Sequence, residues 1–450
     1  MPSLDEDISR VVSAKGKSDP NEFHWTLEVH TPETEFQVEQ LVSVEIIKDY
    51  ANKLTDTYVV EFNMGMGDYT YVVNPHYNEL EGVLECRDKE KVIFSCRMQM
   101  IILNNEGGLN NSKYTNIDQK ELNKVQMVLV RAELVYREVL ELRKILVDGI
   151  CSRTTIKDVL LTMWHQKASQ VEVEGKELEI DIDIVDPANT TTYNNIDIPT
   201  GTNLVTLGHY LQEAEDFYGI YNGHYNNYVS VVKDKFTVYI YPLYDENRFD
   251  NEERKLTIYQ SDNPQLNYAE NVHLLYADGN IDFVANTNTV DTDSGQKPMN
   301  LKGTGFINTN PVQSLQLGGD TRITGKGDKT KAEVACDKES GRITTNRGYD
   351  SKLGNRFNYV GNTNNPYKVA STYHKNSFQI IQIQWPFANP IILTPGMPVC
   401  YKTVSGGEIV ERKGVLQYAH YFYKETSKTM TGQLVIAVDK SQLNRASDES

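Results

Sequence analysis

The stretch from Ser377 to Lys440 carries the strongest strand pattern of the chain and most constrains what the chain can fold into. Ser377–Gln384 alternates its side chains between two faces, and Met397–Thr403 is a short strand. Val415–Tyr423 is the longest strand signal, rich in aromatic residues, and Leu434–Val438 is a last apolar strand. Four strands with tight polar turns would expose their edges as an open sheet. The pattern therefore predicts a small barrel or half of one.

Two predicted turns lie between these strands. In Thr394-Pro395-Gly396, Pro395 fixes φ at the first central position of a type II turn, and Gly396 supplies the positive φ of the second. Ser405-Gly406-Gly407 has the composition of a hairpin turn.

A second β pattern occupies the N-terminal part of the chain. From Phe23 onward, apolar residues alternate with polar ones, as at Trp25, Leu27 and Val29. We expect two hairpins, with turns at Gly65–Asp68 and Asp88–Glu90. Their flanking strands are Tyr58–Asn63 with Tyr69–Val73, and Val83–Arg87 with Val92–Leu103. A first β domain is predicted to end near Gly108.

The middle of the chain mixes helices and strands. Thr154 or Thr155 is expected to cap a helix to about Lys167, and Thr202 or Asn203 a second helix to about Tyr218. Ala132–Leu146 fits either strand or helix, and Val171–Val185 is alternating and acidic. Strands resume at Tyr228–Val232, Phe236–Tyr241, Lys255–Tyr259 and Val272–Tyr276.

These patterns predict a mainly β protein with minor α content, built from two barrel domains, α/β linking segments and a long polar insertion. The expected boundaries are an N-terminal arm or disordered segment (1–22), a first barrel (23–110), a linking region with two short helices (111–222), a second barrel (223–285 and 373–440), an insertion (286–372) and a C-terminal tail (441–450).

Composition restricts the class of protein. The chain has 450 residues and a formal net charge of −17, which argues against free nucleic acid as a partner. Its 27 Tyr suit half-buried sheet surfaces and interfaces, or are simply good strand residues. Five cysteines without a C-x-x-C favour reduced thiols, although Cys86 and Cys96 could face each other across a hairpin. No signal peptide or membrane span is expected.

No motif predicts catalysis, a cofactor or a metal. Gly325-Lys326 resembles the end of a phosphate loop, but Gly319 is misplaced and Gly327 stands where Ser or Thr is needed. Asp291–Gly295 resembles a calcium loop that lacks its closing Glu. His165 and His420 are expected to be ordinary packed or rim residues. The pair Asp181 and Asp183 could mimic a glycosidase dyad, but a solvated strand face is the better interpretation. We expect no enzyme.

Several segments, in order, resemble the baseplate hub proteins of contractile-tailed bacteriophages. They are the C-terminal strands with Leu393-Thr394-Pro395-Gly396, the Ile196–Tyr221 segment that leads into a helix, the Thr324–Asp328 turn and Asn346-Arg347-Gly348-Tyr349. The resemblance covers roughly the last 250 residues, and the first half matches only in pattern.

The resemblance implies a structural virion protein of the tail baseplate, assembled in the host cytoplasm. Hubs of this family are homotrimers whose two similar barrels per subunit adapt a sixfold tail tube to a threefold spike. The implied partners are the tube protein or a tube-initiating ring, the spike or needle, and the baseplate wedge proteins. Genomic DNA would pass through an acidic channel without specific binding. The alternatives are a tail-tip or secretion-spike hub of a non-contractile system, or a receptor- or carbohydrate-binding β protein.

The insertion 286–372 has its own charge. It holds 8 Lys and 4 Arg against 6 Asp and 2 Glu, a formal charge of +4, whereas the rest of the chain carries −21. It has few apolar residues to offset an ordering entropy of ~1–2 kcal/mol per residue. We expect it to be loose in an isolated monomer and ordered at an acidic interface of the assembly. A solvated surface insertion is the alternative.

Overall fold

The computed structural model describes residues 3–15, 23–106, 127–292 and 378–439, with short gaps at 174, 215–217, 233–234, 262, 264–265, 267–270 and 406–407. It also describes the short strands β19 (Gly305–Asn308), β20 (Val334–Cys336), β21 (Ile343–Thr345) and β22 (Phe357–Gly361), and positions 365, 367–368 and 371. Most of the predicted insertion, the Gly325-Lys326 motif and the glycines of the Ser405–Gly407 turn lie outside the described residues. The start of that insertion, Val290–Thr292, is a strand that pairs with Ile381–Ile383, so the second barrel extends past the predicted boundary at residue 285.

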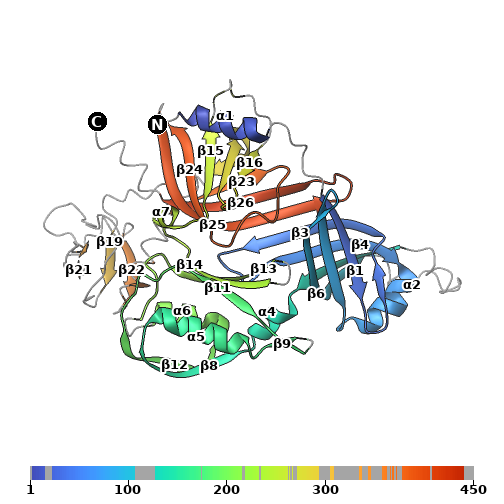
Figure 1. The fold of residues 1–450 in the computed structure, drawn as a ribbon, viewed down its shortest axis with the longest axis horizontal. Helices are drawn as coiled ribbons and strands as arrows, with labels where there is room; N and C mark the ends of the chain where they lie inside the picture. The colour runs from blue at the N-terminus through green and yellow to red at the C-terminus, as the bar shows by residue number, and fades with distance from the viewer. Residues whose placement is uncertain are drawn as a thin grey trace.

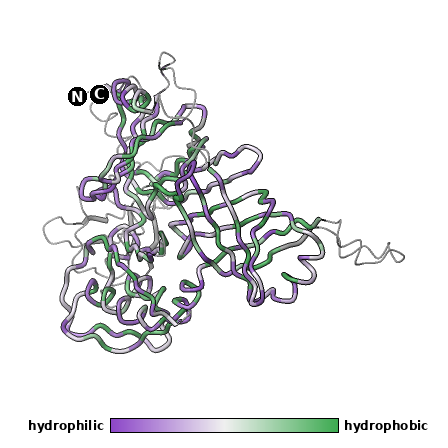
Figure 2. The backbone as a smooth tube through the Cα atoms, turned by 45° about the vertical axis from the view of Figure 1, so that its right-hand side comes forward, coloured by the Kyte–Doolittle hydropathy of each residue, from purple (hydrophilic) through white to green (hydrophobic). Residues whose placement is uncertain are grey.

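The chain is mainly β with minor α, as predicted. Its strands alternate between hydrophilic and hydrophobic residues along most of their length (Figure 2). Most strands belong to one 15-stranded sheet that curls into two barrels (Figure 1). Among the described residues, no helix combines the length and apolar content that a membrane crossing requires.

The first barrel is antiparallel in every described strand pair. Its strands run in the order β3-β4-β7-β6-β5-β1-β2. Their bounds are β1 (Phe23–His30), β2 (Glu35–Gln37), β3 (Gln40–Asp49), β4 (Thr57–Gly65), β5 (Glu81–Asp88), β6 (Lys91–Glu106) and β7 (Met127–Val135). The last of these lies in the predicted linking region, so the barrel extends past residue 110.

One predicted strand of this barrel is wrong. Tyr69–Val73 forms a π-helical turn, η1, between α2 (Met66–Asp68) and the 3-10 turn η2 (Asn74–His76). The helical turn buries both Tyr69 and Val73. In a strand these two side chains would also lie on the same face. The periodicity of so short a segment could not separate strand from helix.

The second barrel combines strands from two distant parts of the sequence. They are β15 (Leu256–Ser261), β16 (Val272–Leu275), β17 (Ile281–Asn286) and β18 (Val290–Thr292), then β23 (Phe378–Trp385), β24 (Pro398–Ser405), β25 (Glu408–Lys424) and β26 (Met430–Asp439). The Asn271 side chain donates to the carbonyl of Gln384 and so draws β16 toward the end of β23. The C-terminal strands predicted from sequence are confirmed, with antiparallel pairing in the order β23-β26-β25-β24.

The two barrels do not share one pairing pattern. In the second barrel β15 pairs parallel with both β17 and β24, whereas the described pairs of the first barrel are all antiparallel. The resemblance to hub proteins implied two similar barrels, but the two barrels of this chain differ in strand order.

A smaller α/β unit lies against both barrels. Its three-stranded sheet has the order β11-β14-β13, from β11 (Ile180–Ile184), β13 (Tyr225–Val232) and β14 (Lys235–Pro242). The β13 and β14 strands, predicted for the second barrel, thus form a separate sheet. The ribbon of β8 (Leu146–Thr154) with β12 (Tyr193–Asn203), the hairpin of β9 (Glu172–Val173) with β10 (Lys176–Glu177), and helices α4 (Arg137–Leu142) and α7 (Arg248–Asn251) complete this region.

The two predicted helices are found here. Helix α5 (Ile156–Ala168) begins after Thr155, whose hydroxyl accepts from the Asp158 amide as a cap. The second helix is shorter than predicted, because α6 (Leu207–Glu213) follows the 3-10 turn η3 (Leu204–Thr206) and gives way to extended backbone at Ala214.

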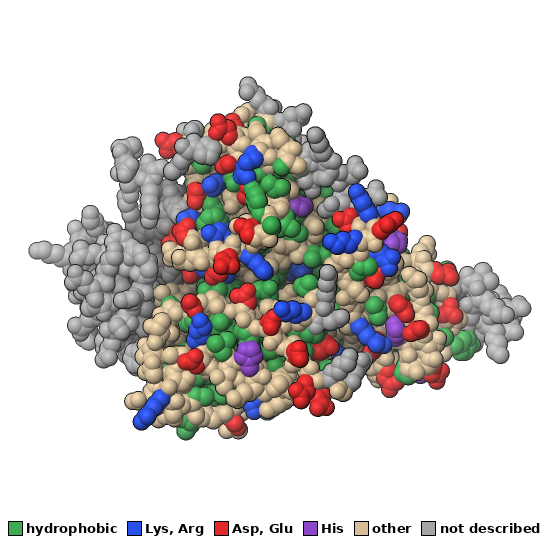
Figure 3. All heavy atoms as spheres, viewed as in Figure 1, with side chains coloured by type: hydrophobic (Ala, Val, Ile, Leu, Met, Phe, Trp, Pro, Cys, Tyr) green, Lys and Arg blue, Asp and Glu red, His purple; other side chains and the backbone are tan. Residues whose placement is uncertain are grey.

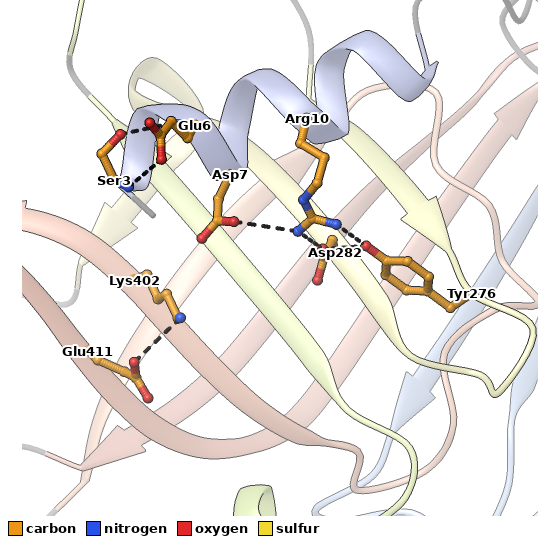
Figure 4. Close-up of polar contacts among 8 residues, drawn as sticks. All are labelled: Ser3, Glu6, Asp7, Arg10, Tyr276, Asp282, Lys402 and Glu411. Carbon is orange, nitrogen blue, oxygen red and sulfur yellow. Dashed lines mark hydrogen bonds and ion pairs between the residues drawn. The ribbon is translucent and has the colours of Figure 1, made fainter. Parts of the chain in front are cut away.

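The expectation that residues 1–22 are disordered or an arm is wrong for the part that forms helix α1 (Leu4–Lys15). Ser3 and Glu6 form a reciprocal capping box, with N–H to side-chain oxygen distances of 2.9 and 3.3 Å (Figure 4). Leu4, Ile8 and Val11 share one face and pack on Tyr259 and Val284 of the second barrel.

Polar contacts also hold α1 near its middle. Arg10 donates to the Tyr276 hydroxyl and lies 2.7 Å from Asp282 of β17 (Figure 4). On the neighbouring strands Lys402 and Glu411 pair at 3.5 Å. The helix thus covers the outer face of β15–β17, which would otherwise expose apolar side chains.

Candidate functional site: the junction between the sheets

The turn that joins β3 to β4, Tyr50–Asp56, connects the first barrel to the three-stranded sheet. Thr55 forms a parallel bridge with Val229 of β13, and the Val229 amide donates to the Leu54 carbonyl at 2.6 Å. We call this segment the junction turn. It extends hydrogen bonding from one sheet into another at a point where both are buried.

Asp56 organises the polar groups of the junction turn. One carboxylate oxygen accepts from Lys48 and from the Tyr58 hydroxyl, both at 2.9 Å, and the other accepts from the Tyr228 hydroxyl at 2.6 Å. Asp56 and Lys48 are both buried, so each charge depends on the other. Because Tyr228 belongs to β13 and the other partners to β3 and β4, this one carboxylate bonds across the junction.

Burial and the charge of Asp56 affect the nearby phenols. Burial, and then the charge of Asp56, raise the pKa of Tyr58 and Tyr228 well above the ordinary tyrosine value. Burial also raises the pKa of Tyr136, whose hydroxyl lies 3.3 Å from that of Tyr58. These phenols therefore remain neutral hydrogen-bond donors over the whole physiological range.

A second turn holds the opposite side of the junction. In Thr394–Met397, the Pro-Gly turn, the Met397 amide donates to the Thr394 carbonyl at 3.3 Å and Gly396 has φ of +58°, so the turn predicted from Pro395-Gly396 is confirmed. Its carbonyl at Gly396 accepts from the buried guanidinium of Arg248 in α7. Burial lowers the pKa of that guanidinium from its ordinary value.

Tyr241 of β14 connects the two turns. Its hydroxyl donates to the Tyr50 carbonyl at 2.7 Å, and its ring lies 5.6 Å from the Arg248 guanidinium carbon. Asn226 of β13 also donates to the Tyr50 carbonyl. The three-stranded sheet is therefore held between a turn of the first barrel and a turn of the second.

The barrels meet directly along one strand pair. β25 pairs with β3 from Tyr418 opposite Asp49 to Lys424 opposite Ser43. Across this seam His420 Nε2 lies 2.8 Å from Glu45 Oε1, and Glu45 also lies 3.4 Å from Arg131 of β7. Acidic and basic side chains alternate over the face shown in Figure 3 without a large patch of one sign.

Tyr421→Phe is expected to change stability at alkaline pH and to leave it unchanged or slightly raised at neutral pH. No group of the described residues forms a hydrogen bond with the buried Tyr421 hydroxyl, and burial, followed by the charge of Asp56, raises its pKa. Unfolded tyrosine ionises near pH 10, whereas the folded state keeps the proton, so this contribution is complete below pH 10 and is lost as pH rises above it. Removing the phenol should reduce the alkaline slope of unfolding free energy by about 1.4 kcal/mol per pH unit. Urea titrations between pH 8 and 11 measure this slope, and an identical slope in the variant would contradict it.

The residues that sequence patterns singled out lie outside the junction. Asp181 and Asp183 lie on the exposed face of β11, where Asp181 pairs with Lys235. His165 is exposed in the last turn of α5, and His420 lies on the rim of the seam. Cys86 lies opposite Phe94 rather than Cys96; both side chains are buried, and no disulfide joins them.

One group of possible metal ligands was not predicted. Glu28, His30 and Glu35 meet on β1 and β2. Glu28 Oε1 lies 3.2 Å from His30 Nε2, but Glu35 Oε2 and the Arg97 guanidinium lie 3.6 and 3.4 Å from Nδ1. Since the carboxylates approach different ring nitrogens and a cation lies beside one of them, the geometry is that of an ion-pair cluster.

Lys48, Asp56 and Tyr228, which form the junction, were not predicted as functional residues from the sequence. Nothing in the local pattern separates them from the other charges and tyrosines of β strands. The abundance of Tyr was the only signal, since a phenol suits a position with one apolar and one polar side.

Comparison with known proteins gives structural likeness alone. No protein-family profile and no curated protein sequence matches the chain. A tail protein from Neisseria meningitidis MC58 matches 92% of this chain and 96% of its own, with 9% identity and a TM-score of 0.46. The 43 kDa tail protein of prophage MuSo2 from Shewanella oneidensis matches 92% and 98%, with 8% identity and a TM-score of 0.43. An Escherichia coli type VI secretion component, described as similar to T4 bacteriophage tail proteins, matches 90% and 74%, with 7% identity and a TM-score of 0.40.

Proposed function

We propose that this chain is a structural subunit of a phage tail, acting as a trimeric hub of the baseplate. The observation that carries this proposal is the continuous sheet through β3 and β25, with the three-stranded sheet fixed between two turns. Such a subunit holds two barrels in one fixed relation, as an adaptor between rings requires. The order of segments that resembles baseplate hubs, including the Pro-Gly turn, supports the same role.

In a trimer of this chain, two barrels per subunit would place six around the axis. The two barrels differ in strand pairing, so a shared fold gives no argument for pseudo-sixfold symmetry. The proposed contacts with a sixfold tail tube and a threefold spike rest on the resemblance to hub proteins and on the fixed relation of the two barrels. A tube protein or initiating ring, a spike or needle and baseplate wedge proteins are the proposed partners. The net charge of −17 would repel DNA phosphates in a central channel. The proposed location is the virion tail after assembly in the host cytoplasm.

We propose no catalytic role. Glu81, which lines a pocket between β5, β6 and α4, is engaged in two ion pairs, at 2.7 Å from Arg97 and 2.6 Å from Arg137. Both oxygens of this carboxylate are in contact with guanidinium groups, so neither is free to approach a substrate. Purified protein should release no soluble fragments from peptidoglycan or capsular polysaccharide, and measurable cleavage would contradict the proposal.

The mass of the purified protein and a cryo-EM reconstruction of the assembled particle test the proposed function. The expected results are a trimer in solution by light scattering and a threefold ring between tail tube and spike in the particle. A monomer that occupies a peripheral fibre would overturn the hub role. The same reconstruction shows whether the tail has a contractile sheath.

A further inference from the structure

An exposed aromatic segment projects from the first barrel. The tyrosine segment, Met66–Leu80, is anchored by the buried side chains of Met66, Tyr69, Val73 and Leu80. With these anchors fixed, Tyr71 and Tyr77 remain 60% and 61% exposed. Rigidly presented tyrosines are typical energetic centres of protein interfaces.

A pocket of about 420 Å³, the junction pocket, opens where the first barrel, the three-stranded sheet and the loop before the Pro-Gly turn meet. Tyr58, Phe94 and Ile391–Leu393 contribute apolar walls. Val232 and Leu275 also line it and are 52% and 49% exposed. An apolar cavity of ~150 Å³ holds a benzene ring, so this volume accommodates aromatic side chains.

The two surfaces differ in charge. The tyrosine segment carries Asp68 and Glu79, both exposed, and contains no Lys or Arg. The junction pocket is lined by the exposed Arg254. Its Asp278 accepts hydrogen bonds from Asn280 at 2.9 and 3.2 Å within its own turn, and its Lys48 pairs with Asp56. Arg254 forms a hydrogen bond with the Tyr239 hydroxyl in the pocket wall, and its exposed guanidinium has further N–H groups to meet an approaching carboxylate.

The tyrosine segment does not reach the junction pocket of its own chain. Figure 1 places α2 at the end of the first barrel away from β13 and β14. We propose that Tyr71 and Tyr77 of one copy insert into the junction pocket of the next copy. Two different surfaces in contact form a heterologous interface, which closes into a ring when repeated by rotation. This inference rests on the proposed trimer and names the contact that builds it.

Alanine replacement of both tyrosines tests the contact. Tyr71→Ala with Tyr77→Ala is expected to weaken association about 30-fold or more, measured by sedimentation equilibrium, without a change in circular dichroism. Ile409→Ala is the matched control, because Ile409 is 51% exposed and lies outside both surfaces. Asp68→Lys and Arg254→Glu should each weaken association, and their combination should restore it.

These outcomes separate this inference from the proposed function. A wild-type trimer that the tyrosine variants leave unchanged would overturn the contact and keep the hub. A wild-type monomer at all concentrations, and within the particle, would overturn both. Failure of the combined charge reversal to restore association would contradict the pairing of these two surfaces.

Discussion

Asp56→Ala is expected to lower the free energy of unfolding by about 3–5 kcal/mol, because it leaves the buried Lys48 ammonium without its partner. The same substitution removes the acceptor of the Tyr58 and Tyr228 hydroxyls. Urea denaturation at pH 7 measures the change. Asp197→Ala on the exposed face of β12 is the control and should alter stability by less than about 0.5 kcal/mol.

A double-mutant cycle separates the contribution of the Lys48–Asp56 ion pair from the other contacts of Asp56. In a Lys48→Met background the cost of Asp56→Ala should fall, since no buried ammonium is then stranded. Equal costs in both backgrounds would show that the carboxylate acts through the tyrosines alone. A change near that of Asp197→Ala in the wild-type background would contradict the buried ion pair as the centre of the junction.

Gly396→Ala is expected to destabilise the protein by about 3 kcal/mol or more, for two additive reasons. Its φ of +58° disfavours any side chain, and an added Cβ would lie 2.2 Å from the Tyr241 ring. Since Tyr241 also donates to the junction turn, its displacement would loosen both turns.

Gly175→Ala separates the backbone strain at positive φ from the clash of an added Cβ with Tyr241. Gly175 has φ of +75°, and no described residue beyond its chain neighbours comes within 4 Å of an added Cβ, so its replacement should cost only the backbone strain of about 1–2 kcal/mol. Thermal denaturation of both variants gives the difference. Equal losses would show that the close approach to Tyr241 adds nothing.

The elements that could be predicted from the sequence are those whose structure local chemistry decides. The Pro395-Gly396 turn, the Thr155 cap and the alternation of β23 to β26 follow from backbone preferences and burial of one face. Helix α1 was not predicted, although Ser3 and Glu6 have capping-box spacing and Leu4, Ile8 and Val11 have helical spacing. Most residues of that segment are polar, which favours disorder in a single sequence. Its three apolar residues stabilise a helix only because they pack on the surface of β15–β17.

The junction could not be predicted for a different reason. Its partners are separated by up to 191 residues, as between Tyr50 and Tyr241, and no periodicity links them. Their meeting depends on which strands share a sheet, and β13 and β14 joined a sheet of their own. A single sequence contains the donors and acceptors but not the pairing that brings them together.

The seam between β25 and β3 has a mechanical consequence. Its ladder runs from Tyr418 to Lys424 on one strand and from Asp49 to Ser43 on the other. A force along these strands loads the hydrogen bonds of the ladder in shear, so that they resist together rather than opening one after another. A displacement imposed on one barrel therefore moves the other barrel with it as a rigid body. A flexible loop between separate domains would instead absorb part of that displacement.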